Sequence, residues 1–317
     1  MRMRQRGVSL VELMISLVLG LLVIALAVQM LLGTRASMST QDAMSYLQES
    51  ARYVSFRLQP LLRNVGYAGC ANANKLSTSD SVIGTYDLQT PLGGSQDTNR
   101  GLSYWQLTFL QADKVTEVAL ASPMSSPAGV IRFSKQDAAL FDTASGEKTA
   151  LVTDCDTTDV FVVDKNDDES VEPKDSLSKA YGAQQSAISS LYVLKAWRLV
   201  LDDQAGTGER ALFLDRTADI TGNGVGGREE LVAGVTGFDV TFSLDTDNDG
   251  QIDRLKVPAE DIDTCAECDW DNVRRIEIAL TLSTQPGVVP GGDDNGRLER
   301  TFNLTFTPRN LQFREGA

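Results

Sequence analysis

The feature that most constrains this chain is an apolar run of membrane length near its start, residues 8–32. Glu12 is the only formally charged residue in this run. A helix of about 20 apolar residues spans the hydrocarbon core of a bilayer, so the run predicts a transmembrane helix. A carboxylate in such a segment is costly in lipid, although less so near the edge. Because a sequence seldom keeps such a residue without a partner, we expect Glu12 to have a role beyond anchoring.

A short basic leader, residues 1–7, precedes the run and contains Arg2, Arg4 and Arg6. A secretory signal would place its cleavage site after the apolar run, next to small residues. Here the candidate site comes before the run, so the run is expected to stay in the mature protein. Arginines on the N-terminal side place that end in the cytoplasm, and the C-terminal bulk is then exported.

The composition excludes several classes of function. Of the 29 lysines and arginines, three lie in the leader, and the remainder face 43 acidic residues. This balance argues against a nucleic-acid partner, because phosphate binding needs a basic face. The chain has no histidine, which excludes histidine-based triads, general bases and metal sites. Four cysteines behind a membrane segment suggest disulfides in an oxidising compartment.

A helical period continues after Gly33, with apolar residues every three or four positions and polar residues on the other side. The apolar stripe consists of Ala43, Met44, Leu47, Ala51, Val54, Leu58, Leu61 and Val65. We expect an amphipathic helix over residues 33–65 that extends the transmembrane span and packs its stripe on a domain. Pro60 should kink or end this helix near residue 59.

From residue 66 to residue 317 the pattern changes to strands separated by turns. Apolar and polar residues alternate most clearly at 236–244, 275–283 and 300–307, which predicts an antiparallel sheet with one buried face. The other predicted strands are 104–110, 115–121, 130–133, 159–163, 191–201, 211–214 and 251–257. Polar stretches at 71–100, 164–187 and 203–227 are expected to be loops or insertions. The predicted fold class is α+β, with a long N-terminal helix packed on an antiparallel β-sheet head domain with large loop insertions.

An acidic loop at residues 245–253 has the spacing D-x-D-x-D-G-x-x-D. Its candidate oxygen donors for calcium are Asp245, Asp247, Asp249, Asp253 and the backbone carbonyl of Gln251. Position twelve is Lys256, where an EF-hand has a bidentate glutamate, and the flanking segments are predicted strands. The alternative is an acidic hairpin tip, because Asp-Gly favours a tight turn. Four neighbouring carboxylates repel one another without a cation, which keeps Ca²⁺ as a candidate ligand.

Two other polar segments carry weaker signals. A second acidic cluster, at residues 164–169, is interpreted as a solvated loop. The glycine-rich stretch 222–227 is not followed by Lys-Ser or Lys-Thr, so a phosphate-binding loop is not indicated.

Cys265 and Cys268 form a C-x-x-C motif, which is compatible with a redox pair, half of a zinc site or a short disulfide. Acidic residues flank the motif and would raise the pKa of a thiol, which disfavours a reactive thiolate. A four-cysteine zinc site would also need Cys70 and Cys155, at unsuitable spacing. Of the three pairings that four cysteines allow, we favour Cys70–Cys155 with Cys265–Cys268. The first bond would tie the end of the helix to the sheet domain.

Residues 7–13, Gly-Val-Ser-Leu-Val-Glu-Leu, resemble the cleavage and methylation motif of type IV pilins and pseudopilins. The resemblance implies that prepilin peptidase cuts between Gly7 and Val8 and methylates the new amino terminus at Val8. Glu12 would then be the fifth residue of the mature chain, the acidic position of the family. The family usually begins with Phe, whereas this chain has Val8, and minor members tolerate other apolar residues there.

Val8 and Glu12 are four residues apart and would share a helix face. After cleavage, Glu12 can pair with its own terminal ammonium or with that of an adjacent subunit. Pairing between subunits would offset desolvation and set the axial register of an assembly. The alternative is an ordinary single-span anchor with an incidental glutamate.

The chain as a whole resembles the PilW group of minor pilins, through segments 63–70, 153–156, 230–235, 245–250 and 270–276. This resemblance implies a single-pass inner-membrane protein with a periplasmic head, which later enters the pilus at the cell surface. It would help to initiate and assemble type IV pili in a tip or priming complex. The implied partners are other minor pilins, the major pilin and a tip adhesin, and the chain would act by assembly without catalysis.

Two alternatives stay open at this point. A type II secretion pseudopilin of the tip complex shares the N-terminal motif. A membrane-anchored periplasmic enzyme would need a catalytic constellation, and nothing in the sequence singles one out. Paired carboxylates for glycoside chemistry remain compatible with so many acidic residues.

Overall fold

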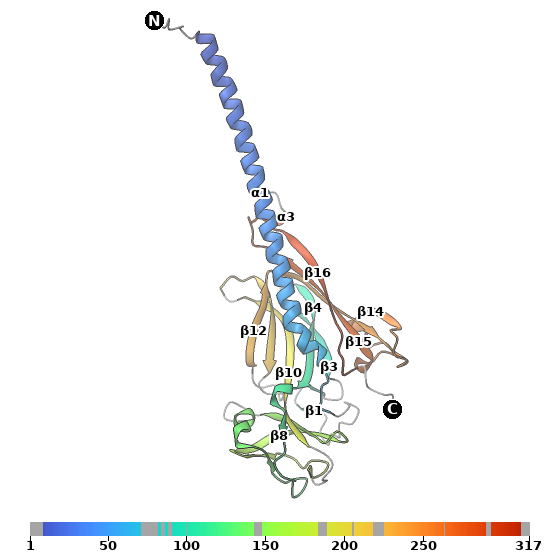
Figure 1. Ribbon diagram of the computed structural model, residues 1–317. Coiled ribbons are helices and arrows are strands. Elements are labelled where there is room, and N and C mark those ends of the chain that lie inside the picture. The colour runs from blue at the N-terminus through green and yellow to red at the C-terminus, as the bar shows by residue number, and fades with distance from the viewer. Residues whose placement is uncertain are drawn as a thin grey trace. The chain divides into compact units, whose positions relative to one another are not determined.

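The structure is a computed structural model (Figure 1) and describes residues 9–70, 82–83, 86–87, 91–99, 101–142, 148–182, 189–204, 206–217, 225–262, 264–289 and 293–311. The chain forms two compact units. The first comprises Met1–Glu49 and Ser283–Arg300, and the second comprises Ser50–Leu282 and Thr301–Ala317. Each unit is described separately below.

One helix, α1 (Leu10–Arg63), contains both the apolar run and the amphipathic segment. It belongs to the first unit up to Glu49 and to the second from Ser50. The predicted end near residue 59 is wrong, because Pro60 lies inside the helix. Proline has no backbone N–H to donate within the helix. Its own carbonyl, in the last turn, accepts a hydrogen bond from the side chain of Asn64 (2.8 Å).

In the first unit, residues 283–300 fold back on themselves around a short helix, α3 (Asp293–Gly296). The amide of Gly287 donates to the carbonyl of Asn295 (2.8 Å), and the amide of Thr284 donates to that of Leu298 (3.0 Å). The hydroxyl of Ser39 on α1 donates to the carbonyl of Val288. This bond attaches the helix to the folded-back segment.

The second unit contains a ten-stranded sheet, and the strand pairs described in it are antiparallel. Its strands are β3 (Leu92–Asn99), β4 (Leu102–Ala112), β5 (Val118–Ala119), β6 (Ile131–Arg132), β7 (Thr149–Thr153), β8 (Thr158–Asp167), β9 (Ser170–Pro173), β10 (Ser190–Asp203), β11 (Arg210–Thr217) and β12 (Val225–Ala233). The long strand β10 joins two half-sheets. Its C-terminal part pairs with β4 and β11, and its N-terminal part pairs with β5 and β7.

A second sheet has the strand order β14-β13-β15-β16. Its strands are β13 (Val235–Leu244), β14 (Arg254–Pro258), β15 (Val273–Ser283) and β16 (Glu299–Phe306). The alternating residues predicted to face inward on β13 and β15 are at most 5 % exposed: Phe238, Val240, Phe242, Leu244, Ile276, Ile278, Leu280 and Leu282. The rings of Tyr104 on β4 and Phe238 on β13 pack edge to face, with centroids 6.4 Å apart. The two sheets therefore meet through their apolar faces, which confirms the predicted buried face.

Short elements connect these strands. They are β1 (Val82–Ile83), which pairs with β2 (Tyr86–Asp87), the helix α2 (Ala259–Ile262), and the 3₁₀ turns η2 (Lys114–Thr116), η3 (Lys135–Phe141) and η4 (Trp270–Asn272).

Several parts of the strand prediction are wrong. The strands β3 and β9 lie in stretches expected to be loops, β8 continues into one of them, and β12 begins at the end of another and was not predicted. The second acidic cluster therefore lies at the β8–β9 hairpin, where Asp168 pairs with Lys135 (2.7 Å). The segment predicted as a strand from residue 115 begins with η2, because Asp113 caps the amide of Val115 (3.1 Å). The strand predicted from residue 251 begins only at Arg254.

Within the second unit, the last turns of α1 are part of the head. Ala51, Val54, Leu58 and Leu62 are at most 3 % exposed, and burial of an aliphatic side chain is worth about 1.5–3 kcal/mol. After the helix, the amide of Gly66 donates to the carbonyl of Leu110 on β4 (2.9 Å). The structure therefore confirms an α+β fold with a long helix and an antiparallel β-rich head.

Candidate functional site

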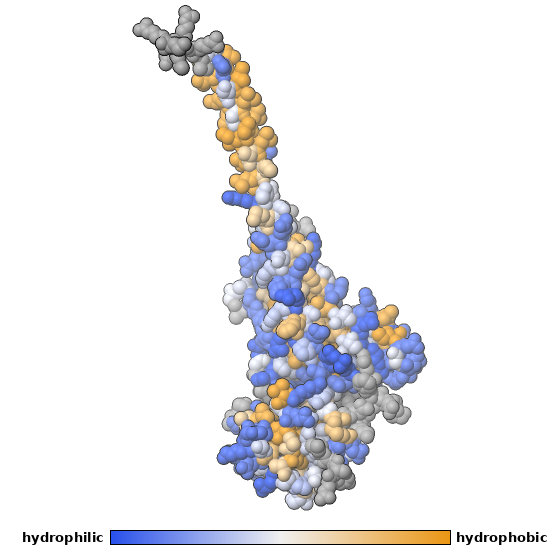
Figure 2. All heavy atoms as spheres, viewed as in Figure 1, coloured by the Kyte–Doolittle hydropathy of each residue, from blue (hydrophilic) through white to orange (hydrophobic). Residues whose placement is uncertain are grey.

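The N-terminal part of α1 is an exposed apolar surface. Its large apolar side chains from Leu10 to Leu32 are 47–78 % exposed, and Figure 2 shows a mostly hydrophobic surface along this part of the helix. By length and composition this helix can cross a membrane. An apolar surface of this size on a single chain needs a cover of lipid or of other apolar helices.

Glu12 interrupts this surface in the first turn of α1, and its side chain is exposed. The hydroxyl of Ser16 donates to the backbone carbonyl of Glu12 (2.7 Å). Within the part of the chain that the structure describes, no side chain pairs with its carboxylate. Gly7 and Val8, the predicted cleavage position, lie outside the described residues. The pairing of Glu12 with a terminal ammonium therefore stays a prediction.

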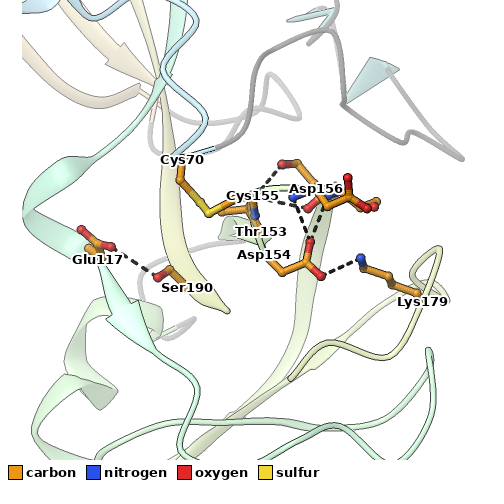
Figure 3. The surroundings of a disulfide bond; sticks show 10 residues. Cys70, Glu117, Thr153, Asp154, Cys155, Asp156, Lys179 and Ser190 are labelled. Carbon is orange, nitrogen blue, oxygen red and sulfur yellow. Dashed lines mark hydrogen bonds and ion pairs between the residues drawn. A yellow bond between two sulfur atoms is a disulfide. The ribbon is translucent and has the colours of Figure 1, made fainter. Parts of the chain in front are cut away.

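Two disulfides bond all four cysteines, in the pairing favoured from the sequence. Cys70 follows the end of α1 and is bonded to Cys155, 85 residues further on, in the turn between β7 and β8 (Figure 3). Beside it, Asp154 forms an ion pair with Lys179 (2.6 Å). Closing a loop of this length contributes about 4–5 kcal/mol in the chain-entropy account. The bond therefore fixes the exit of the helix to the sheet.

The acidic loop connects β13 to β14. The side chain of Asp245 is fully buried, and its Oδ2 atom accepts hydrogen bonds from the amide of Gly250 (3.1 Å) and from Nε of Arg274 (3.2 Å). Carboxylate oxygens of Asp245, Asp247 and Asp253 lie within 4.8 Å of one another. The structure thus brings together three of the predicted calcium ligands.

Asp249, the fourth carboxylate predicted as a ligand, is not in this group. Asp249 accepts hydrogen bonds from the amide and the side chain of Gln251 (2.7 and 3.0 Å), so both of its oxygens are used within the loop. The backbone carbonyl of Gln251 stays a predicted ligand.

Arg274 is the residue of this site that the sequence interpretation missed. Its Nη1 atom donates to the carbonyls of Leu311 (2.8 Å) and Asp271 (3.1 Å), and Nη2 donates to Oδ1 of Asn248 (3.0 Å). One buried guanidinium therefore links the acidic loop, β15 and the C-terminal segment. The segment Trp-Asp-Asn-Val-Arg-Arg-Ile contains Arg274 and could have pointed to this residue. From the sequence it was interpreted only through its resemblance to PilW.

A groove of about 860 Å³ lies beside the end of α1. Its lining residues are Phe56, Arg57, Gln59, Pro60, Arg63, Asn64, Lys114, Arg309 and Asn310. Four of these are cationic, and none is an acid, a thiol or a hydroxyl. The groove offers positive charge and lacks a nucleophile with a neighbouring base, which acyl-transfer chemistry would need.

Two buried carboxylates elsewhere in the head, Asp215 and Asp159, take part in structural contacts. Asp215 lies between Arg198 (3.2 Å) and Arg228 (2.8 Å). Oδ2 of Asp159 accepts three hydrogen bonds, from the amide and hydroxyl of Ser178 and from the hydroxyl of Tyr181. Burial is the main cause that raises the pKa of Tyr181, which keeps this hydroxyl a donor. Asp215 therefore links β10, β11 and β12, and Asp159 links β8 to the segment after β9.

Comparison with known protein families gives two matches. Residues 2–28 match the prokaryotic N-terminal methylation motif. Residues 199–309, about a third of the chain, match the type IV pilus-assembly protein W family. These two matches are consistent with a PilW-family type IV minor pilin. Searches of curated proteins and of solved structures give no match.

The PilW-type segment contains the functional features of the second sheet. It runs from β10 to Arg309 and includes the acidic loop and Arg274. Together with the methylation motif, which is a substrate of prepilin peptidase, it supports a minor-pilin role in type IV pilus assembly. A pilin of this kind is anchored through its N-terminal helix and works with other pilins and the pilus machinery. Both matched families indicate a structural protein.

Proposed function

We propose that prepilin peptidase cleaves the chain between Gly7 and Val8 and methylates Val8, and that the mature subunit enters the type IV pilus as part of a tip or priming complex. The observation that carries this proposal is the exposed apolar part of α1 with Glu12 as its single charge. Lipid covers this surface while the subunit waits in the inner membrane. Neighbouring subunit helices replace the lipid on assembly.

The orientation follows from the charges around the helix. The arginines of residues 1–7 hold the N-terminus in the cytoplasm, and the head lies in the periplasm before incorporation. A periplasmic head suits the two disulfides, which persist in an oxidising compartment. At the cell surface the head would then be displayed as part of the pilus.

The specific partners are proposed from the same argument. In the pilus the apolar helix would pack on the helices of the major pilin and of other minor pilins. Glu12 would pair with the terminal ammonium of an adjacent subunit, which offsets the cost of placing a carboxylate among apolar helices. The head would contact the other minor pilins and a tip adhesin.

Intact-mass spectrometry of the chain purified from cells tests the processing step. We expect a mass that lacks residues 1–7 and carries one added methyl group at Val8. The same chain from cells without prepilin peptidase should keep its full length, which serves as the control. A mature N-terminus located after the apolar run, as in a secreted protein, would contradict the proposal.

A further inference from the structure

We propose that the loop at residues 245–253 binds a calcium ion through the carboxylates of Asp245, Asp247 and Asp253. Oxygen atoms of these three side chains lie within 4.8 Å of one another. Calcium binds oxygen at about 2.3–2.6 Å, so two ligands on one ion are at most about 5 Å apart. The three oxygens thus fit around one Ca²⁺ as they stand. Magnesium demands near-ideal octahedral geometry and gives up its water reluctantly, so a site built from protein carboxylates favours calcium.

A buried oxygen without a partner marks the centre of this site. The side chain of Asp245 is fully buried, and its Oδ1 atom has no hydrogen-bond partner among the described residues. Its Oδ2 atom is used by Gly250 and Arg274. A carboxylate oxygen is costly to bury without a donor or a cation. Of the acidic residues in this loop, only Asp245 has this need, and a cation shared with Asp247 and Asp253 meets it.

Hydrogen bonds within the loop also position the carboxylates of Asp247 and Asp253. Asp247 uses Oδ1 to accept the amide of Asp249 (3.1 Å). Asp253 uses Oδ2 to accept the amide and hydroxyl of Thr246 (2.8 and 3.1 Å). The amide of Asp247 also donates to the Asp253 carboxylate. Both carboxylates are therefore held in place by the loop, and both side chains are exposed at its surface. Asp249 differs, because Gln251 occupies both of its oxygens.

The charge balance also favours a cation. The loop has four carboxylates, and Arg274 is the basic side chain that pairs with one of them, Asp245. The neighbouring Arg254 pairs with Glu267 (2.9 Å). Within the described part of the chain, neither Asp247 nor Asp253 has an ion-pair partner. A divalent ion would relieve the remaining repulsion.

Bound calcium would stabilise one edge of the head. Arg274 already connects the loop to the carbonyl of Leu311 and to Asn248. Fixing the three carboxylates would fix the β13–β14 connection against β15 and the C-terminal segment. This role concerns the head alone and does not depend on assembly into a pilus.

Calorimetric titration of the full chain in detergent, after removal of metals with a chelator, tests the proposal. We expect one calcium site with a dissociation constant on the order of 10⁻⁴ M or tighter, as in extracellular calcium modules, weaker binding of magnesium, and a higher unfolding temperature with calcium. Asp247→Asn should weaken calcium binding at least tenfold. This exposed position keeps its Oδ1 acceptor, so the variant should unfold at the wild-type temperature in chelator.

Asp249→Asn is the matched control, because it removes the same charge from the same loop outside the proposed ligand set. We expect its calcium affinity to stay within about threefold of the wild type. Absence of binding heat and of thermal stabilisation at about 10⁻² M calcium, well above the weakest affinities of extracellular modules, would overturn the proposal. Equal losses in the two variants would also overturn it, since they would indicate a diffuse charge effect.

Discussion

The two parts of α1 meet opposite environments, although they belong to one continuous helix. From Leu10 to Leu32 its large apolar side chains are exposed, and from Ala51 to Leu62 its apolar stripe is buried. The difference lies in the distribution of apolar residues. An all-round apolar helix suits lipid or a helical bundle, whereas a one-sided stripe suits the surface of a sheet. The first part is thus built for assembly and the second for folding of the head.

Truncating leucine on the two parts of the helix should separate these roles most strongly. Leu58→Ala removes a fully buried side chain, so we expect the head to lose about 2–5 kcal/mol of unfolding free energy. Leu22→Ala, the matched change at a side chain 56 % exposed, should stay within about 0.5 kcal/mol. Chemical unfolding of the full chain in detergent measures both. Similar losses for the two variants would remove the distinction between the two parts.

A smaller effect should come from the ion pair that attaches the buried part of the helix to β12. Arg57 contacts Glu229 at 2.7 Å, and both side chains are about one third exposed (32 and 36 %). The hydrogen bonds from Arg57 lower the pKa of Glu229 below its ordinary value of 4.5. The pair therefore stabilises the head above that value, and this contribution is lost as the pH falls through the lowered pKa.

We expect Glu229→Gln to cost about 0.2–1 kcal/mol at pH 7, since solvent screens a pair of this exposure. The cost should shrink as the pH falls below 4.5 and through the lowered pKa of Glu229, because the wild-type carboxylate is then protonated. Urea unfolding at pH 7 and at a series of lower pH values measures it, with Glu230→Gln as the control at the adjacent exposed position. A cost that persists or grows at low pH would show that Glu229 acts through packing.

The elements predicted from the sequence are those with strong local periodicity. Alternation identified β13 and β15 because both bury one face, and helical spacing identified α1. The strands β3 and β12 were missed. Both are edge strands, and the five residues 94–98 of β3 are exposed, so β3 needs no apolar pattern. Their formation depends on pairing with β4 and β11, which no local signal shows.

The candidate site likewise combines features that the local sequence predicts with features that depend on tertiary packing. The spacing of the acidic loop was enough to nominate five donors. It could not show that Asp249 pairs within the loop or that Asp245 is buried beside Arg274. That burial depends on the register of β13 with β15, where Leu244 lies opposite Val273. The N-terminal motif was readable because its signal is confined to one helical segment.

The most direct test of the division of α1 is the amount of Glu12→Val subunit in purified pili. The account predicts that this variant inserts in the membrane and is cleaved like the wild type, because valine suits lipid better than glutamate. It should nevertheless be strongly depleted from sheared pili, since the pairing partner for a neighbouring terminal ammonium is lost. Quantitative immunoblots measure the amount of cleaved subunit in the membrane fraction and the amount of subunit in the pilus fraction. Wild-type incorporation of Glu12→Val into pili would contradict the assembly role assigned to this helix.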